Sequence, residues 1–163
     1  MLDMLRAHGL DAGPTQRPVL AGALCGLLAD LPALPLLHVM GTFARLEPVI
    51  GDVSLWLQIA STAFAGAGYG LVFQRAANDA RGGWLFGMAF GYLLWQAVSV
   101  PTLQWIPSRP LLDGTPSQGL LLAHLVWGLA AGLLFPLVHR PLKASVRSSR
   151  PKPGAARFGE RGR

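Results

Sequence analysis

Residues 114–139 of the chain read GTPSQGLLLAHLVWGLAAGLLFPLVH and contain no formally charged side chain. A helix needs about 20 residues to cross the hydrocarbon core of a bilayer, so this stretch is long enough to do so. Its apolar residues are continuous rather than alternating, which argues against a transmembrane strand. Because hydrocarbon offers no hydrogen-bond partners to the backbone, the stretch is predicted to cross a membrane as an α-helix.

Three more stretches share this character. Residues 18–40 contain one charged side chain, that of Asp30, and residues 53–74 and 82–108 contain none. The segments between them carry Gly, Pro or charged residues, which are typical of loops, and short loops favour antiparallel hairpins. We therefore predict an all-α integral membrane protein, a four-helix bundle of antiparallel hairpins with spans at residues 18–40, 53–74, 82–101 and 119–139 and loops at residues 41–52, 75–81 and 101–118.

The composition agrees with a membrane protein. Hydrophobic residues make up 52% of the chain and charged residues 13%, whereas a soluble domain has about 25% charged residues. Mean hydropathy is +0.40. The chain has one cysteine, which excludes a disulfide scaffold.

The net charge of +6 is concentrated at one end of the chain. Residues 1–139 hold six Lys or Arg and seven Asp or Glu, whereas residues 140–163 hold eight Lys or Arg and one acid. We predict that this second segment is a disordered tail at an anionic lipid surface. Nucleic acid is not an expected partner, because the segment has a single aromatic residue, Phe158, on which a base could stack. The basic residues expected to face lipid are Arg140, Lys143, Arg147, Arg150 and Lys152.

The distribution of Lys and Arg predicts the orientation. With residues 1–17 in the cytoplasm, the segments on that side carry twelve Lys or Arg, and the outer loops carry two, Arg45 and Arg109. Cytoplasmic segments of membrane proteins are the more basic ones. We therefore expect a multi-pass protein of the cell inner (plasma) membrane, with a membrane domain at residues 18–139 and both termini in the cytoplasm.

Each predicted span carries two glycines four positions apart, which places both on one face of a helix. Glycine allows helix backbones to approach closely in lipid, where no hydrophobic drive brings helices together. The pairs also predict a 2+2 parallel repeat, in which the first two spans correspond to the last two. The pairs are Gly22 and Gly26, Gly66 and Gly70, Gly87 and Gly91, and Gly128 and Gly132.

Polar residues inside the spans define a candidate site in the outer half of the membrane. Asp30 is the only acid in a span, and an acid at the bilayer centre costs about 2.5–3.5 kcal/mol on insertion scales. Pro32 and Pro35 lack the amide hydrogens that would bond two carbonyls of the preceding turn, so Asp30 beside those carbonyls is a candidate to hold a cation or proton. The alternative is a protonated Asp30 that is hydrogen-bonded to a neighbouring helix. The full candidate set is Asp30, His38, Gln58, Thr62, Gln96 and His124.

Cofactor chemistry has a weaker basis in the sequence. His38 and His124 fall in the same predicted leaflet, so a haem with two axial imidazoles is one alternative and a bound quinone or lipid is another. The sequence has no cysteine pair, no His-x-x-x-His motif and no Gly-rich phosphate loop followed by Lys. We therefore expect no resident cofactor, no metal site and no enzymatic activity.

The last two spans carry a resemblance to a known family. The sequence WLFG at residues 84–87 and QAVSVP at residues 96–101 is followed by HLVWGLAAG at residues 124–132. Over residues 18–139 the chain resembles an uncharacterised bacterial and archaeal family of small four-helix integral membrane proteins, whose last helix has a His-Leu-aromatic-Gly-xxx-Gly pattern. That family often has a histidine where this chain has Gln58. The resemblance implies an accessory membrane subunit, since some relatives are expected among respiratory-chain or oxidase components.

Two functional hypotheses follow. The first is a non-catalytic accessory or structural subunit of a larger membrane complex, of a respiratory or other energy-transducing kind. The second is a bundle that binds or transports an ion or small molecule (a proton, quinone, lipid or haem) through Asp30 and His124. The expected partners are anionic lipid at the cytoplasmic face and other membrane-protein subunits.

Overall fold

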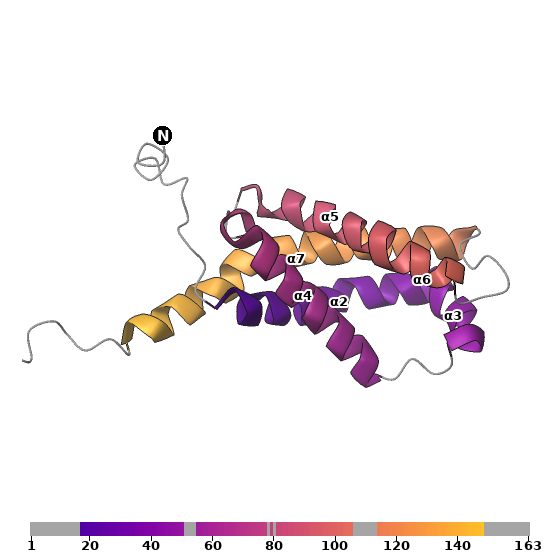
Figure 1. Cartoon of the computed structure of the whole chain (residues 1–163), viewed down its shortest axis with the longest axis horizontal. Coiled ribbons are helices and arrows are strands. Elements are labelled where there is room, and N and C mark those ends of the chain that lie inside the picture. Colours follow the sequence, from indigo (N-terminus) through magenta and orange to yellow (C-terminus); the bar gives the residue numbers. More distant parts are fainter. Residues whose placement is uncertain (1–16, 51–54, 78, 80, 106–113, 149–163) are drawn as a thin grey trace, which may run out of the picture.

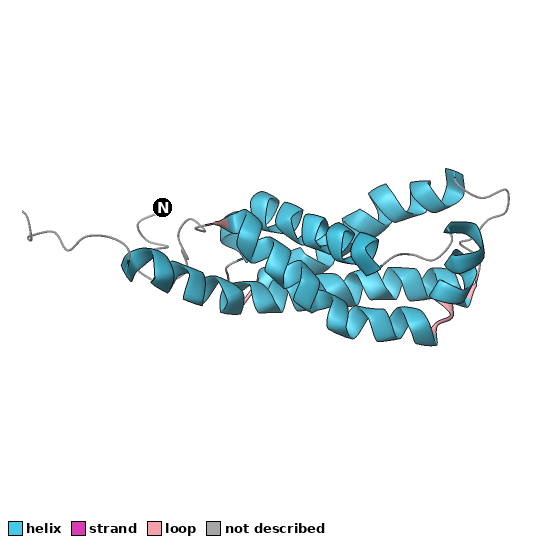
Figure 2. Ribbon diagram, turned by 90° about the horizontal axis from the view of Figure 1, so that it is seen from below, coloured by secondary structure: helices cyan, strands magenta, loops and turns pink. Residues whose placement is uncertain are grey.

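The computed structural model describes residues 17–50, 55–77, 79, 81–105 and 114–148. All regular structure in these ranges is helical, which confirms the predicted all-α class (Figure 1). Figure 2 shows the same helices after a quarter turn. The elements, in chain order, are α2 (Pro18–Val39), α3 (Thr42–Ile50), α4 (Leu55–Ala77), α5 (Gly83–Leu94), the π-helix η1 (Trp95–Ser99), α6 (Val100–Trp105) and α7 (Thr115–Ser148).

The long helices lie side by side. α7 packs against both α2 and α5, while α4 packs mainly against α2. In Figure 1, α2, α5 and α7 follow the long axis of the molecule and α4 crosses it obliquely. α5, η1 and α6 follow one another without a break, so residues 83–105 form a single long helix with one wide turn.

Three of the four predicted spans are long and apolar enough to cross a membrane. They are the helical segments Pro18–Val39, Gly83–Leu103 and Thr115–Leu142. The remaining predicted span is also a helix, α4, of 23 residues, but it is not one of these three segments.

The interior is built from small residues and a few aromatic rings. One core cluster contains Ala21, Cys25, Tyr69, Ala77 and Phe135, and the other contains Ala29, Ala33, Ala123, Trp127 and Ala131. Many large apolar side chains point outward instead, as Phe64 does with 82% of its surface exposed. Lipid tails are as apolar as leucine, so such a distribution is the one expected for helices that pack in a bilayer.

Two predicted loops are partly helical. The segment at residues 41–52 contains α3, and the segment at residues 101–118 begins inside α6 and ends inside α7. A turn at Gly41, whose φ is +70°, separates α2 from α3. The buried hydroxyl of Thr42 then donates a hydrogen bond to the carbonyl of Pro116 at 3.0 Å, which fixes α3 against the start of α7. This contact between distant parts of the chain explains why the loop prediction at residues 41–52 was incomplete.

The predicted disordered tail at residues 140–163 also needs correction. α7 continues to Ser148, so Arg140, Lys143 and Arg147 belong to a helix. Leu142 packs against the core cluster that contains Phe135, and this contact extends the ordered helix beyond the predicted span. Arg150 and Lys152 lie outside the described residues, as does most of the predicted N-terminal segment at residues 1–17.

Candidate functional site in the apolar helices

The first two glycine pairs meet each other between α2 and α4. A methyl group on Gly22 would overlap the carbonyl of Gly66, and one on Gly66 would overlap the carbonyl of Gly22. Gly26 faces the backbone of Gly66, and Gly70 faces that of Gly22. The two backbones are therefore in direct contact, which only glycine permits at these positions.

The other two pairs meet in the same manner between α5 and α7. Gly87 faces the carbonyl of Gly128, and Gly128 faces the carbonyl of Gly87. A methyl group on Gly132 would overlap the carbonyl of Gly83, and Gly91 lies against the carbonyl of His124. The eight glycines that the sequence singled out thus form two seams, each between neighbouring long helices.

The two seams share one register. Gly26 faces the carbonyl of Thr62 in the first seam, and Gly91 faces the carbonyl of His124 in the second. Thr62 and His124 therefore occupy corresponding positions. Continuing one turn along α2 and α5 places Asp30 and Trp95 at corresponding positions as well, because each follows its seam glycine by four residues.

Asp30 lies beside two of the predicted site residues. Its carboxyl is buried and accepts a hydrogen bond from Nε2 of Gln58, with Oδ2 and Nε2 3.4 Å apart. The Thr62 hydroxyl also interacts with this carboxyl. Thr62 is itself held in place by a hydrogen bond from its hydroxyl to the carbonyl of Gln58, at 2.9 Å. The structure thus brings Asp30, Gln58 and Thr62 together where α2 meets α4.

The prolines of α2 face away from Asp30. Pro32 and Pro35 are both exposed. The carbonyls they leave without donors belong to Leu28 and Leu31, whose side chains are 43% and 69% exposed. Asp30 is buried and its hydrogen-bond partner Gln58 lies on α4, so the expected group of an acid beside two free carbonyls stays a prediction.

His124 lies in a different seam and is fully hydrogen-bonded. Its Nδ1 lies 2.8 Å from the carbonyl oxygen of Leu120, and its Nε2 lies 2.9 Å from Oγ of Ser99. A carbonyl can only accept, so we assign the proton to Nδ1. Nε2 then accepts the hydrogen bond of the Ser99 hydroxyl, and η1 is tied to α7.

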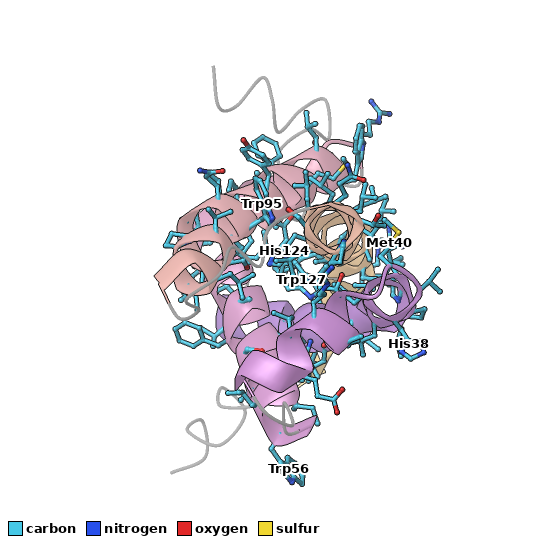
Figure 3. All side chains as sticks on the ribbon, turned by 90° about the vertical axis from the view of Figure 1, so that its right-hand side faces the viewer. His38, Met40, Trp56, Trp95, His124 and Trp127 are labelled. Atoms are coloured by element: carbon cyan, nitrogen blue, oxygen red, sulfur yellow. The ribbon has the colours of Figure 1, made fainter. Side chains whose placement is uncertain are left out.

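The candidate residues form two separate groups, one around Asp30 and one around His124, and His38 and Gln96 belong to neither. Asp30 and His124 share no hydrogen bond, and their partners lie on different helices. His38 and Gln96 are exposed. Figure 3 shows His38 on the outside of the molecule, whereas His124 points between helices. Within the described ranges, no group of three or more His, Cys, Asp or Glu side chains is placed to hold a metal ion.

Sequence reasoning missed several residues that hold the helices together. The Tyr69 hydroxyl donates to the carbonyl of Gly83 at 3.0 Å, and Nε1 of Trp127 donates to the carbonyl of Gly26 at 3.0 Å. His139 is also buried, and its ring packs on that of Phe135. The spacing of residues could have indicated that Trp127 is buried. Trp127 lies four residues from both Ala123 and Ala131, so the three share one face of α7, and that face is buried.

Comparison with models of protein families, with curated proteins and with solved structures finds no match to this chain. The class of protein therefore rests on the structure alone. It is an all-helical protein with three helices that are long and apolar enough to cross a membrane, which is consistent with a membrane protein.

Proposed function

We propose that the chain is a four-helix integral membrane bundle of antiparallel hairpins and a non-catalytic accessory or structural subunit of a larger membrane complex. The fourth span is α4. Several of its outward side chains are large and apolar, with Trp56 78% exposed and Val72 69% exposed. Lipid or a neighbouring protein covers such a surface at lower free-energy cost than water does. The matching register of the two glycine seams supports the 2+2 repeat.

The proposed orientation is supported by exposed arginines at one end of the molecule. Arg17, Arg81 and Arg140 are exposed where α2 begins, α5 begins and α7 leaves the other helices. The opposite end carries Arg45 and Glu47 on α3, whose charges balance. By the positive-inside rule the arginine-rich end faces the cytoplasm of a cell inner (plasma) membrane. Anionic lipid is the expected partner of that end.

The observation that carries the accessory role is the internal hydrogen bonding of the Asp30 and His124 side chains. Asp30 is engaged by Gln58 and Thr62, and both ring nitrogens of His124 have partners within the molecule. The glycine seams bring backbones into contact and leave no room between them for even a methyl group at their glycines. Such an arrangement stabilises a compact bundle and leaves its outer surface to make contacts with other subunits.

The test is purification from native membranes in a mild detergent, followed by size measurement and mass spectrometry. We expect a defined assembly in which a second membrane protein is present at a fixed stoichiometry. The same preparation in a harsh detergent serves as the control and should release the chain from that assembly. A chain that runs apart from every other protein in all mild detergents would contradict the proposal.

A second candidate function, binding or transport of a proton, other cation or small molecule, is favoured by Asp30. This acid is buried in an apolar helix, and its hydrogen bond with Gln58 is long at 3.4 Å. Replacing Asp30 with Asn keeps the shape and removes the charge. A measured loss of proton or cation flux in vesicles with Asp30→Asn, and no loss with the matched control Asp79→Asn at the helix end, would favour this function. Equal flux in both variants would count against it.

A further inference from the structure

An amide without a partner lies on the outside of the helix at residues 83–105. Gln96 is exposed, and its side chain makes no hydrogen bond with the other residues that the structure describes. It falls within the apolar segment Gly83–Leu103, about 18 Å beyond Trp84 at a helical rise of about 1.5 Å per residue. Hydrocarbon cannot satisfy an amide, so a lipid-facing glutamine at this depth is unfavourable unless another polar group meets it.

The backbone at Gln96 also lacks a helical partner. The two residues whose amides lie within reach of the Gln96 carbonyl along the helix are Val100 and Pro101. In η1 the amide of Val100 donates to the carbonyl of Trp95 instead. Pro101 has no amide hydrogen. The side-chain amide and the backbone carbonyl of Gln96 therefore both lack a hydrogen-bond partner within the helix.

We propose that this face binds a second copy of the chain, with the Gln96 amides of the two copies hydrogen-bonded to each other. This inference goes beyond the accessory role and does not depend on it. A primary amide carries both a donor and an acceptor, so two of them satisfy one another. In a two-fold dimer whose axis follows the membrane normal, the same residue of both copies lies at the same depth. A different protein would need a polar residue placed at that depth.

The surface around Gln96 suits a close helix pair. Leu85, Ala89, Leu93 and Ala97 are exposed at intervals of four residues, and Gln96 adjoins this row. The two alanines are small enough to let a second backbone approach, as helix contacts in membranes require. Tyr92 stacks on Trp95 with ring centroids 5.8 Å apart, beside the same row.

Disulfide cross-linking in native membranes tests the proposal. The reporter is Leu93→Cys, which leaves Gln96 in place, and wild type gives the baseline because its one cysteine, Cys25, is fully buried. We expect Leu93→Cys to form cross-linked dimers of this chain. The matched control is Phe64→Cys on α4, which is more exposed than Leu93 and should cross-link weakly because it lies on another helix.

The double variant Leu93→Cys/Gln96→Leu isolates the amide. We expect the dimer association constant to fall about tenfold, because interhelical hydrogen bonds are lost, and Gln96→Asn to restore part of it. Light scattering of the wild-type chain produced and purified without other subunits, in a mild detergent, should give the mass of a dimer. The proposal is overturned if Leu93→Cys cross-links only to a different protein, if it does no better than Phe64→Cys, or if Gln96→Leu has no effect.

Discussion

The indole Nε1 of Trp127 lies 3.0 Å from the carbonyl oxygen of Gly26 and donates a buried hydrogen bond to it. This bond joins α7 to α2, and so it links the two halves of the molecule that the glycine seams build separately. Gly26 is itself part of the first seam. Gly26 therefore contacts two helices. Because it has no side chain, its backbone packs directly against α4, and its carbonyl accepts the hydrogen bond from α7.

Replacement of Trp127 by Phe should lower the stability of the folded state. The variant loses the bond to Gly26 and part of a buried ring, and a hydrogen bond between membrane helices is worth about 0.6–2 kcal/mol. We expect a loss of about 1–3 kcal/mol once the reduced packing is included. The measurement is unfolding by SDS in detergent micelles, followed by circular dichroism. Trp56→Phe is the control, since Trp56 is exposed, and an equal loss in both variants would contradict the role of the bond.

The glycine seams make a sharper prediction, because α4 offers its own control. A Cβ on Gly66 would overlap the backbone of α2, whereas a Cβ on Gly68 would lie 3.6 Å from the ring of Phe90, an ordinary contact. Gly66→Ala should therefore separate the helices and cost about 1–3 kcal/mol or more, as overpacking does. Gly68→Ala should be nearly neutral. The same unfolding measurement checks both, and equal stability of the two variants would refute the close backbone contact.

The Tyr69 hydroxyl predicts a smaller effect. It donates to the carbonyl of Gly83 from a side chain that is fully buried, so Tyr69→Phe removes a bond while the ring remains. We expect a loss of about 1 kcal/mol, the usual net worth of one hydrogen bond. Tyr92→Phe, on an exposed ring, is the matched change and should have no measurable effect. The prediction fails if Tyr69→Phe is as stable as wild type.

The packing glycines were predictable from sequence because the reason for them is local. Two glycines four positions apart lie on one helix face. In a membrane helix, such a face is typical of close packing against another helix. The structure brings Gly22 against Gly66 and Gly87 against Gly128, so each contact joins two long helices that follow one another in the chain. The helical class followed from the apolar runs for a similarly general reason.

The polar site was less predictable because it depends on how each helix is rotated. Gln96 and His38 fall in the expected half of the molecule and yet face outward. In η1 the wide turn has bonds from residue i to residue i−5, which rotates the residues that follow relative to an uninterrupted α-helix. This rotation accompanies the contact of Ser99 with His124, and nothing in the local sequence besides Pro101 indicates it.

The contact between Ser99 and His124 is best tested by a double-mutant cycle. Ser99→Ala leaves the partly buried Nε2 of His124 without its donor between η1 and α7, and an unsatisfied acceptor away from water costs about 1–3 kcal/mol. Ser99→Ala should therefore destabilise the wild type by that amount but have little effect when His124 is already Leu, giving a coupling of about 1–3 kcal/mol. Ser61→Ala is the matched control, since the exposed Ser61 hydroxyl bonds only the carbonyl of Gln58 in its own helix, at 2.9 Å. Additive losses in the two single variants, measured by the same unfolding titration, would show that the two side chains do not act together.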